Sequence, residues 1–324
     1  MKNILILGGT GFVGAHVCEK LAREEWDITV ATRRENNARN VMHLPGLTVQ
    51  ECDIHDEAAL TRLAKGHDAV VNLVAILHGD KQSFQRVHVD LPRKIAAACA
   101  ASGVTRLVHV SALGANPQQP QSAPSMYLRS KSEGEAVLLA QCSALALTIL
   151  RPSVIFGHGD KFLNLFAAMQ QVAPFVPLAC ADAQFQPVWV EDVANAVVKA
   201  LERTHPGAQT YEACGPEVFT LKQLVEISAK LAGINQGKGR PVFSLPHWAA
   251  SLQARTMEML PGNPLMSRDN LDSMKLPSVA TPGAPGLSAL GIEPAALQAV
   301  AGDYLDEGSP WHSLLGVRKR ANWK

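Results

Sequence analysis

The sequence predicts an α/β fold, in which a doubly wound parallel sheet is followed by a smaller C-terminal lobe of mixed structure. Short apolar runs alternate with segments of helical periodicity up to residue 151, and such runs are typical of strands buried in a parallel sheet. Beyond that point the alternation is less regular, and prolines and glycines are frequent after residue 241. A chain of 324 residues, 47% of them hydrophobic and 18% charged, is long and apolar enough for one or two domains with a large core.

The first half of the chain is predicted to alternate between strand and helix. Strands are expected at residues 3–7, 27–32, 47–51, 69–73, 106–111 and 146–151, and helices at 13–23, 57–64, 90–102 and 127–140. Right-handed crossovers between parallel strands leave a crevice at their carboxyl ends, where ligands bind. The proline- and glutamine-rich segment ANPQQPQSAPS (115–125) follows a strand, so we expect irregular backbone at this edge of the sheet.

The second half is predicted to hold helices at 161–171, 192–203 and 220–232, the last with Thr220 as its N-cap, and a strand near 186–190. We therefore expect a domain built on the sheet at 1–152, whose sheet is partly completed by later segments. A smaller lobe for a substrate or a partner is expected at 153–324.

Composition excludes several classes of protein. Thirty basic residues against twenty-nine acidic ones leave no basic excess, so no nucleic-acid partner is expected. The six cysteines form no CxxC pair and the eleven histidines form no HExxH pair, so we expect no metal site, and buried thiols in a reducing compartment. His88 and His109 lie in apolar surroundings and are expected to be hydrogen-bonded core histidines.

No targeting or membrane-spanning segment is expected from the sequence, so the predicted location is the cytoplasm. The run ILIL (4–7) is too short for the core of a signal peptide, and the apolar stretch 137–150 is interrupted by Gln141 and Ser143. The basic tail VRKRANWK (317–324) is expected to be a solvated end, with contact to an anionic lipid as the alternative.

A glycine pattern lies between the first strand and the first helix. Gly8, Gly11 and Gly14 form GxxGxxG, in which the first glycine permits the turn, the second lets the backbone approach a pyrophosphate, and the third lets helix pack against strand. The amide groups and the dipole of the helix start favour a phosphate. This context predicts a Rossmann-type NAD(P)-binding domain.

The end of the second strand bears on which dinucleotide binds. An NAD site usually has a carboxylate there, but this chain has Thr32 followed by Arg33 and Arg34. Two guanidinium groups suit a 2′-phosphate, which favours NADP(H) over NAD(H). The alternative is that both arginines are solvated loop residues.

Tyr127 and Lys131 form a YxxxK pair that shares one face of the predicted helix. An ammonium near a phenol is expected to lower the pKa of the phenol and to bind the ribose of the nicotinamide, which makes the tyrosine usable as an acid or base. A surface Tyr/Lys pair without a function is the alternative.

These motifs resemble the short-chain dehydrogenase/reductase superfamily. The resemblance rests on GGTGFVG (8–14), the CD pair at 52–53, NLVA (72–75), VTRLVHVSALG (104–114), YxxxK and LRPSVIFGHGD (150–160). FQPVWVEDVANAV (185–197) and YEACGPEVFTLKQL (211–224) are similar to its extended branch of epimerases, dehydratases and reductases. Within that branch the chain resembles the atypical group that includes the nucleotide-binding accessory subunit of respiratory complex I and its bacterial relatives. The resemblance ends at about residue 235.

The resemblance implies roles for particular residues. Asp53 and Ile54 would contact the adenine, Val74 and Ala75 would line the nicotinamide side, and the turn after Pro152 would cover the nicotinamide. The whole expected cofactor set is Gly8, Thr10, Gly11, Phe12, Val13, Gly14, Arg33, Arg34, Asp53, Ile54, Leu73, Val74, Ala75, Tyr127, Lys131, Pro152 and Val154.

The chain departs from the family at the third catalytic position. The family places a Ser or Thr just after the serine that ends the strand, and here Ala112 or Leu113 occupies that position. Ser111 is the nearest hydroxyl and is counted with Tyr127 and Lys131 as a catalytic candidate, although a structural role at the strand end is expected for it. The family's asparagine in the preceding helix is replaced by Asp90.

The sequence supports two main functions. The first is an NADP(H)-dependent oxidoreductase that acts on a small, unknown and apolar substrate. The second is an accessory or assembly factor that holds NADPH within a larger respiratory-type complex; an epimerase or dehydratase is a weaker third. The segment LPHWAASLQARTMEMLPG (245–262) has Trp248, Leu252, Met259 and Leu260 at helical spacing, so it is expected to pack on its own lobe, with a membrane or a partner protein as the alternative.

Overall fold

The structure is a computed structural model of the chain, and it describes residues 2–142, 144–204, 206–258 and 266–305. The chain divides into two compact units. The first consists of Met1–Pro152, Val190–Ala213 and Ala280–Glu293, and the second of Ser153–Trp189, Cys214–Val279 and Pro294–Lys324. The basic tail 317–324 and the pair Met259 and Leu260, whose surroundings were predicted from the sequence, lie outside the described residues.

The first unit is built on a seven-stranded parallel sheet, as the sequence predicts. The order across the sheet is β11-β6-β5-β4-β1-β2-β3. The strands are β1 (Asn3–Leu7), β2 (Asp27–Thr32), β3 (Leu47–Glu51), β4 (Ala69–Asn72), β5 (Arg106–Val110), β6 (Ala146–Pro152) and β11 (Gly207–Ala213). The strand order reverses at β1, whose neighbours are β2 and β4. Reversal of this kind opens the crevice in which doubly wound sheets bind ligands.

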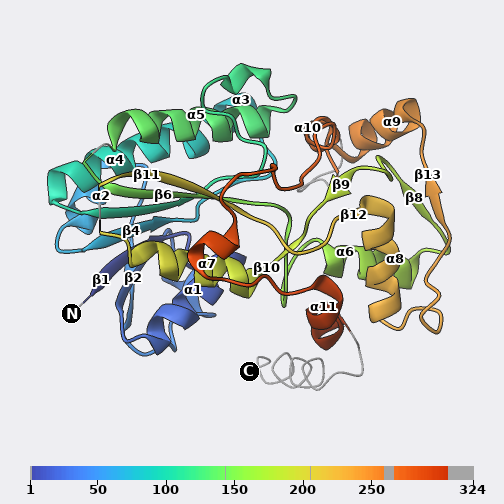
Figure 1. The fold of residues 1–324 in the computed structure, drawn as a ribbon, viewed down its shortest axis with the longest axis horizontal. Coiled ribbons are helices and arrows are strands. Elements are labelled where there is room, and N and C mark those ends of the chain that lie inside the picture. The colour runs from blue at the N-terminus through green and yellow to red at the C-terminus, as the bar shows by residue number, and fades with distance from the viewer. Residues whose placement is uncertain (1, 143, 205, 259–265, 306–324) are drawn as a thin grey trace. The chain divides into compact units, whose positions relative to one another are not determined.

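Helices cover both faces of this sheet (Figure 1). One face carries α1 (Phe12–Arg23) and α7 (Val190–Leu201), and the other carries α2 (Glu57–Ala64), α4 (Leu91–Ser102) and α5 (Met126–Gln141). The inner strands β1, β4, β5 and β6 are almost wholly buried because both of their faces are covered, whereas the edge strand β3 has no buried residue. A short helix α3 (Lys81–Phe84) and a π-helical turn (Gln85–Asp90) lead into α4.

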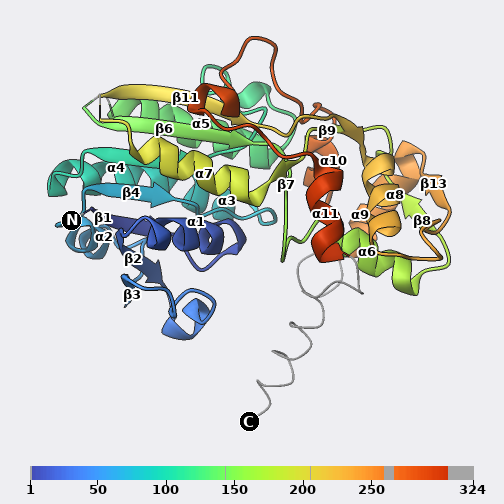
Figure 2. The same ribbon diagram turned by 60° about the horizontal axis from the view of Figure 1, so that its bottom comes forward.

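The second unit combines short strands with five helices in the described part of the chain. The strand pairs are β7 (Ile155–Phe156) with β10 (Val188–Trp189), β8 (Val176–Leu178) with β13 (Val242–Ser244), and β9 (Gln184–Phe185) with β12 (Phe219–Thr220). The helices are α6 (Leu163–Val172), α8 (Leu221–Leu231), α9 (His247–Glu258), α10 (Arg268–Ser273) and α11 (Leu297–Leu305), of which Figure 2 shows α6, α8 and α11 in a second view. Its core is formed by α6, α8 and α11.

Most predicted elements of the first half are confirmed, and their ends differ by no more than one residue. Thr220 is the N-cap of α8, where it forms a capping box with Gln223. The elements of the first unit that were missed include β11, which lacks a continuous apolar run, and the helical segment 81–90 before α4, and the short strands β7, β8, β9, β12 and β13 of the second unit were not predicted either. The helix predicted from residue 161 begins at Leu163 instead, because the Asp160 carboxylate accepts from the amides of Phe162 and Asn164. No helix in the described residues has the length and apolar character needed to cross a bilayer.

Candidate functional site

The glycine cradle joins β1 to α1 and lies against the end of β4. Gly8 has a φ of +86°, and a Cβ there would lie 3.1 Å from the carbonyl carbon of Leu73 and from the amide nitrogen of Val74. A Cβ on Gly14 would overlap the carbonyl oxygen of Gly8, which accepts a hydrogen bond from the Gly11 amide at 3.1 Å. Only glycine permits this approach of helix to strand.

The first turn of α1 presents its amide groups to the cradle. Gly11 is the N-cap, and no side chain caps the helix; the first turn, which begins with Phe12 and Val13, contains no acidic residue. Unpaired helix-start amides and the positive end of the helix dipole form an anion site. The Asn40 amide donates to the Thr10 carbonyl at 3.3 Å and so ties the segment after β2 to the cradle.

The segment after β2 has no carboxylate at the strand end. Thr32 is buried, and its hydroxyl donates to the carbonyl oxygen of Arg34 at 3.0 Å. Arg33 and Arg34 are both exposed. Cys52 donates from its amide to the Thr32 carbonyl at 2.9 Å, which brings the end of β3 beside this turn.

Asp53 and Ile54 follow directly after β3. The Asp53 carboxylate accepts from the His55 amide at 3.0 Å, and Ile54 packs on the hydrophobic core under the sheet. At the end of β4, Leu73, Val74 and Ala75 follow Asn72, whose side-chain oxygen accepts from the Val74 amide at 3.2 Å.

The structure thus brings the cradle, the two arginines and the residues after β3 and β4 to the carboxyl edge of one sheet. Pro152 ends β6 at this edge, whereas Val154 belongs to the second unit and accepts there from the Val188 amide at 3.0 Å.

One face of α5 carries the proton-transfer candidates. Tyr127, Lys131 and Glu135 are spaced four residues apart and therefore lie along one face of the helix. Lys131 is only 2% exposed, and its Nζ donates to the carbonyl oxygen of Val110, the last residue of β5, at 3.1 Å. Burial lowers the pKa of Lys131 to about 8, and the charge of Glu135 opposes this shift.

Glu135 is fully buried and paired with Arg151 of β6. The Arg151 guanidinium donates to both carboxylate oxygens, from Nε at 2.9 and 3.2 Å and from Nη2 at 2.5 Å. This arginine compensates the charge of the buried carboxylate. Arg151, Glu135 and Lys131 therefore form a row of charged groups of alternating sign beneath α5.

The expected effect of Lys131 on the phenol is wrong for this structure. Burial raises the pKa of Tyr127 to about 12, and the Lys131 ammonium is held at the Val110 carbonyl. Desolvation raises the pKa because it disfavours the charged phenolate. Tyr127 therefore stays protonated near neutral pH, so it can donate a proton but is a poor base.

The end of β5 offers no hydroxyl where the resemblance implies one. Ala112 and Leu113 are buried there, and the Leu113 amide donates to the Pro152 carbonyl at 3.0 Å. The Ser111 amide donates to the Leu150 carbonyl at 2.8 Å, but its buried hydroxyl has no hydrogen-bond partner. The structure therefore shows no hydrogen bond through which this hydroxyl would have a structural role at the strand end.

Two histidines complete a buried polar layer between the sheet and α5. The Asn72 amide donates to Nδ1 of His109 at 3.0 Å, while Nε2 of His109 has no partner, so that histidine is only half satisfied. His88 is bonded through both ring nitrogens, as the sequence predicted for a core histidine. Burial and the charge of Lys131 lower the pKa of His109 to about 3 and of His88 to about 2, which keeps both rings neutral.

The sequence did not identify Asn72 or the bonding of His88 as parts of the site. The only available signal was their place in NLVA, at the end of a strand, and in VHVD, before the helix.

The six cysteines are free thiols, four of them buried, and Cys52 and Cys180 partly exposed. Among the described residues no cluster of potential metal ligands is present.

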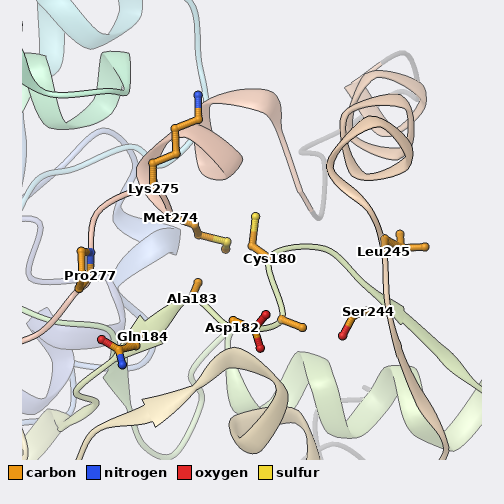
Figure 3. Close-up of a pocket in the computed structure, with 10 residues that line it drawn as sticks. Cys180, Asp182, Ala183, Gln184, Ser244, Leu245, Met274, Lys275 and Pro277 are labelled. Atoms are coloured by element: carbon orange, nitrogen blue, oxygen red, sulfur yellow. The ribbon is translucent and has the colours of Figure 1, made fainter.

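The second unit contains a cavity of about 380 Å³ (Figure 3). Asp182, Gln184 and Ser244 supply polar groups, and Cys180 and Met274 present sulfur atoms to it, whereas Lys275 extends away in the view of Figure 3. Cys180 has a φ of +51°, a conformation rare for a residue with a side chain.

Comparisons with known proteins agree with the fold and the cradle. The family model described as NAD dependent epimerase/dehydratase family matches residues 4–214. Subunit 9 of the NADH dehydrogenase (ubiquinone) 1 alpha subcomplex, mitochondrial, from Mus musculus is 30% identical over 302 residues, which cover 90% of this chain and 77% of the mouse protein. Ceramide reductase of Caulobacter vibrioides is 33% identical over 198 residues, which cover 60% of this chain and 59% of that protein.

Solved structures share the fold at lower identity. The UDP-N-acetylglucosamine 4-epimerase from Methanobrevibacter ruminantium M1, in complex with UDP-N-acetylmuramic acid, has a TM-score of 0.69 at 18% identity and covers 97% of this chain and 99% of its own. The Bordetella bronchiseptica enzyme WbmH in complex with NAD+ has a TM-score of 0.68 at 20% identity, over 93% of this chain and 96% of its own.

Proposed function

The chain belongs to the NAD dependent epimerase/dehydratase family, and on that premise we propose that it is an NADP(H)-dependent oxidoreductase of the extended short-chain dehydrogenase/reductase branch. The first unit binds the dinucleotide at the carboxyl ends of its strands. Tyr127 is the general acid, and Lys131 is its electrostatic partner and the ligand of the nicotinamide ribose. The reduced cofactor, when bound, supplies a hydride.

The observation that carries the proposal is the burial of Lys131 beside Tyr127 at the edge of the sheet. A buried cation costs stability unless it is compensated, and such groups with strongly shifted pKa values gather at functional sites. Glu135, itself neutralised by Arg151, supports the protonated lysine. The high pKa keeps Tyr127 protonated at neutral pH, so the proton that carbonyl reduction needs is present on the phenol, which the same shift makes a weaker acid.

The pair Arg33 and Arg34 supports NADP(H) over NAD(H). Both side chains are exposed beside the end of β2, where the chain has a threonine in place of a carboxylate. A guanidinium pairs with a phosphate in bidentate geometry and offers nothing comparable to a bare ribose hydroxyl.

Ala112 and Leu113 limit the rate that this site can reach. A hydroxyl that polarises the substrate carbonyl is worth roughly 2–4 kcal/mol of barrier in sites of this kind. Its absence predicts slow turnover unless the substrate or a water molecule takes its place.

The cavity in the second unit is a candidate ligand-binding site of that unit. Its lining combines apolar and sulfur-bearing side chains with the carboxylate of Asp182 and the hydroxyl of Ser244. Such a lining fits a molecule that has both apolar and hydrogen-bonding groups, and the similarity to a ceramide reductase supports substrates of that kind.

The test of the proposal is Tyr127→Phe. With carbonyl compounds of the long-chain amide and ketone class, we expect NADPH oxidation by the wild-type chain and its loss in the variant, while NADPH affinity is unchanged. Oxidation at an equal rate in Tyr127→Phe would exclude Tyr127 as the acid. Ser132→Ala, a change at a buried serine of the same helix, is the control.

A second candidate is an accessory subunit that holds NADPH without turnover, peripheral to a membrane or a complex. The similarity to subunit 9 over 90% of the chain favours it, and so does the missing hydroxyl at Ala112 and Leu113. On the surface of the second unit Phe243, Trp248 and Leu252 are 57%, 72% and 56% exposed, although the sequence favoured packing of this segment on its own lobe.

The second candidate predicts that this surface is covered in the cell. Trp248→Ser with Leu252→Ser should reduce co-sedimentation with membranes or co-purification of stoichiometric partners. Met42→Ser, a change at an exposed apolar residue of the first unit, should leave both unchanged. Equal co-sedimentation and equal co-purification of partners in the wild type and in both variants would count against an accessory role.

A further inference from the structure

A buried hydrogen-bond chain connects the loop after β4 with the backbone of Tyr127. His88 is at its centre, in the π-helical turn Gln85–Asp90 that precedes α4, and its side chain is 2% exposed. π-helical turns are rare and are frequently found at functional sites. In this turn the imidazole of His88 lies between the loop after β4 and helix α5.

The bonding of His88 fixes its tautomer. The Ile76 amide donates to Nε2 at 3.2 Å, so Nε2 carries no proton. In a neutral ring the proton must then be on Nδ1, which donates to the Ser130 hydroxyl at 2.8 Å. The Ser130 hydroxyl in turn donates to the Tyr127 carbonyl oxygen at 2.8 Å. All three hydrogen bonds are therefore donated in the same direction, from residue 76 toward residue 127.

Packing reinforces the same connection. The ring of His88 meets that of Tyr127 edge-on, with centroids 5.5 Å apart, and Phe84 contacts both rings. One turn beyond Ser130, a Cβ on Gly134 would overlap the carbonyl oxygen of His88. The helix of Tyr127 thus contacts His88 through a side chain at one turn and through bare backbone at the next.

The two ends of the chain are parts of the proposed site. Ile76 follows Val74 and Ala75, which are expected on the nicotinamide side, and Leu73 and Val74 lie beside Gly8. The other end is the residue proposed as general acid. Three hydrogen bonds therefore connect the loop after β4 with Tyr127 in the first turn of α5.

We propose that His88 is a positioning residue, which together with Ser130 couples the conformation of the cofactor loop (residues 73–76) to the position of Tyr127. This inference rests on the proposed function, because that function gives Tyr127 its catalytic role.

The test uses the full chain with tyrosine labelled with ¹³C at Cζ. The chain has three tyrosines, so Tyr127→Phe assigns the Tyr127 signal. Amide hydrogen exchange of Ile76 reports the other end of the chain. Both are measured, without nucleotide and with NADPH, in the wild type, His88→Leu, Ser130→Ala, the double variant and His88→Gln. Ser132→Ala is the matched control, because its hydroxyl bonds Leu128 and Asn116 and lies outside the chain.

If the two ends are coupled, the Ile76 amide should exchange about tenfold faster than in the wild type in both Ser130→Ala and His88→Leu, because each variant loses a buried hydrogen bond. The ¹³C signal of Tyr127 should shift in both variants. The double variant should change no more than the larger single variant, because all three break one chain. His88→Gln should recover part of the effect, since an amide can accept from Ile76 and donate to Ser130.

Unchanged exchange of Ile76 in Ser130→Ala, or strictly additive effects in the double variant, would overturn the coupling. Should His88→Leu fail to fold, Ser130→Ala alone still breaks the middle bond. Failure of the wild type to bind NADPH would overturn the proposed function instead, while the nucleotide-free measurements would still decide the coupling.

Discussion

Lys131 donates from Nζ to the carbonyl oxygen of Val110 at 3.1 Å, so the ammonium of a nearly inaccessible side chain is held at the end of β5. The bond joins α5, the helix of the proposed proton donor, to the carboxyl edge of the sheet. Burial destabilises the charge on this lysine, and that cost is measurable.

The first prediction follows from the pKa of Lys131, which burial lowers from 10.5 to about 8. Between these pH values the unfolded chain binds more protons than the folded chain, so the free energy of unfolding rises with pH. Urea unfolding from pH 8 to pH 10 should show this rise in the wild type, and it should be smaller in Lys131→Met. If the free energy of unfolding rises with pH as steeply in Lys131→Met as in the wild type, the lowered pKa of Lys131 is contradicted. Lys199→Met, at an exposed lysine, is the control.

The cradle gives the second prediction. Gly14→Ala places a methyl group on the carbonyl oxygen of Gly8, so α1 must move away from β1. We expect loss of NADPH binding, measured by the fluorescence of the bound nucleotide, together with a lower melting temperature. Gly302→Ala is the control, because its added Cβ meets only a side-chain atom of Leu231 at 3.8 Å in α11. Normal nucleotide affinity in Gly14→Ala would show that the helix start does not bind the phosphates.

Cofactor preference is tested at Arg33 and Arg34. Loss of hydrogen bonds from a cation to a phosphate costs about 1.5–3 kcal/mol, which is roughly a ten- to hundredfold loss of affinity. The double variant Arg33→Ala with Arg34→Ala should lose NADPH affinity to this extent and keep its NADH affinity. Arg39→Ala, on the same exposed segment, should change neither. An unchanged ratio of the two affinities would remove the basis for NADP(H).

A further prediction concerns the contact of α1 with α7. Glu191 accepts from His16 at 2.5 Å and from Lys20 at 2.7 Å, and although burial opposes the shift, these hydrogen bonds lower the pKa of the carboxyl to about 2. The stability that this group contributes is therefore present above pH 4.5 and lost as the pH falls toward 2. Glu191→Gln should cost about 1–2 kcal/mol near neutral pH and much less near pH 2. Glu226→Gln, which removes an exposed ion pair, is the control. An equal loss of stability in Glu191→Gln at both pH values would contradict the prediction.

The sequence predicted the parts of the fold that depend on local pattern. The apolar runs located β1, β4, β5 and β6 because strands buried on both faces leave few polar positions. Gly8, Gly11 and Gly14 predicted the cradle because the turn requires glycine. The spacing of Tyr127 and Lys131 predicted a shared helix face.

What the sequence did not predict depends on tertiary contacts. β11 is a strand because it pairs with β6, and its own residues GAQTYEA give little indication of it. The sign of the Tyr127 shift depends on how deeply the phenol is buried, which spacing does not reveal. The connection from Ile76 through His88 and Ser130 joins residues far apart in the chain, so no local pattern predicts it.

The most direct test of the central claim is to identify the nucleotide that the purified chain releases on denaturation, and then to follow exchange of the native chain with added NADPH. An NADP(H)-dependent oxidoreductase predicts NADP(H), or an empty site that fills with NADPH, and exchange within seconds. A tightly retained nucleotide that does not exchange, or a chain that takes up only NADH, would contradict it.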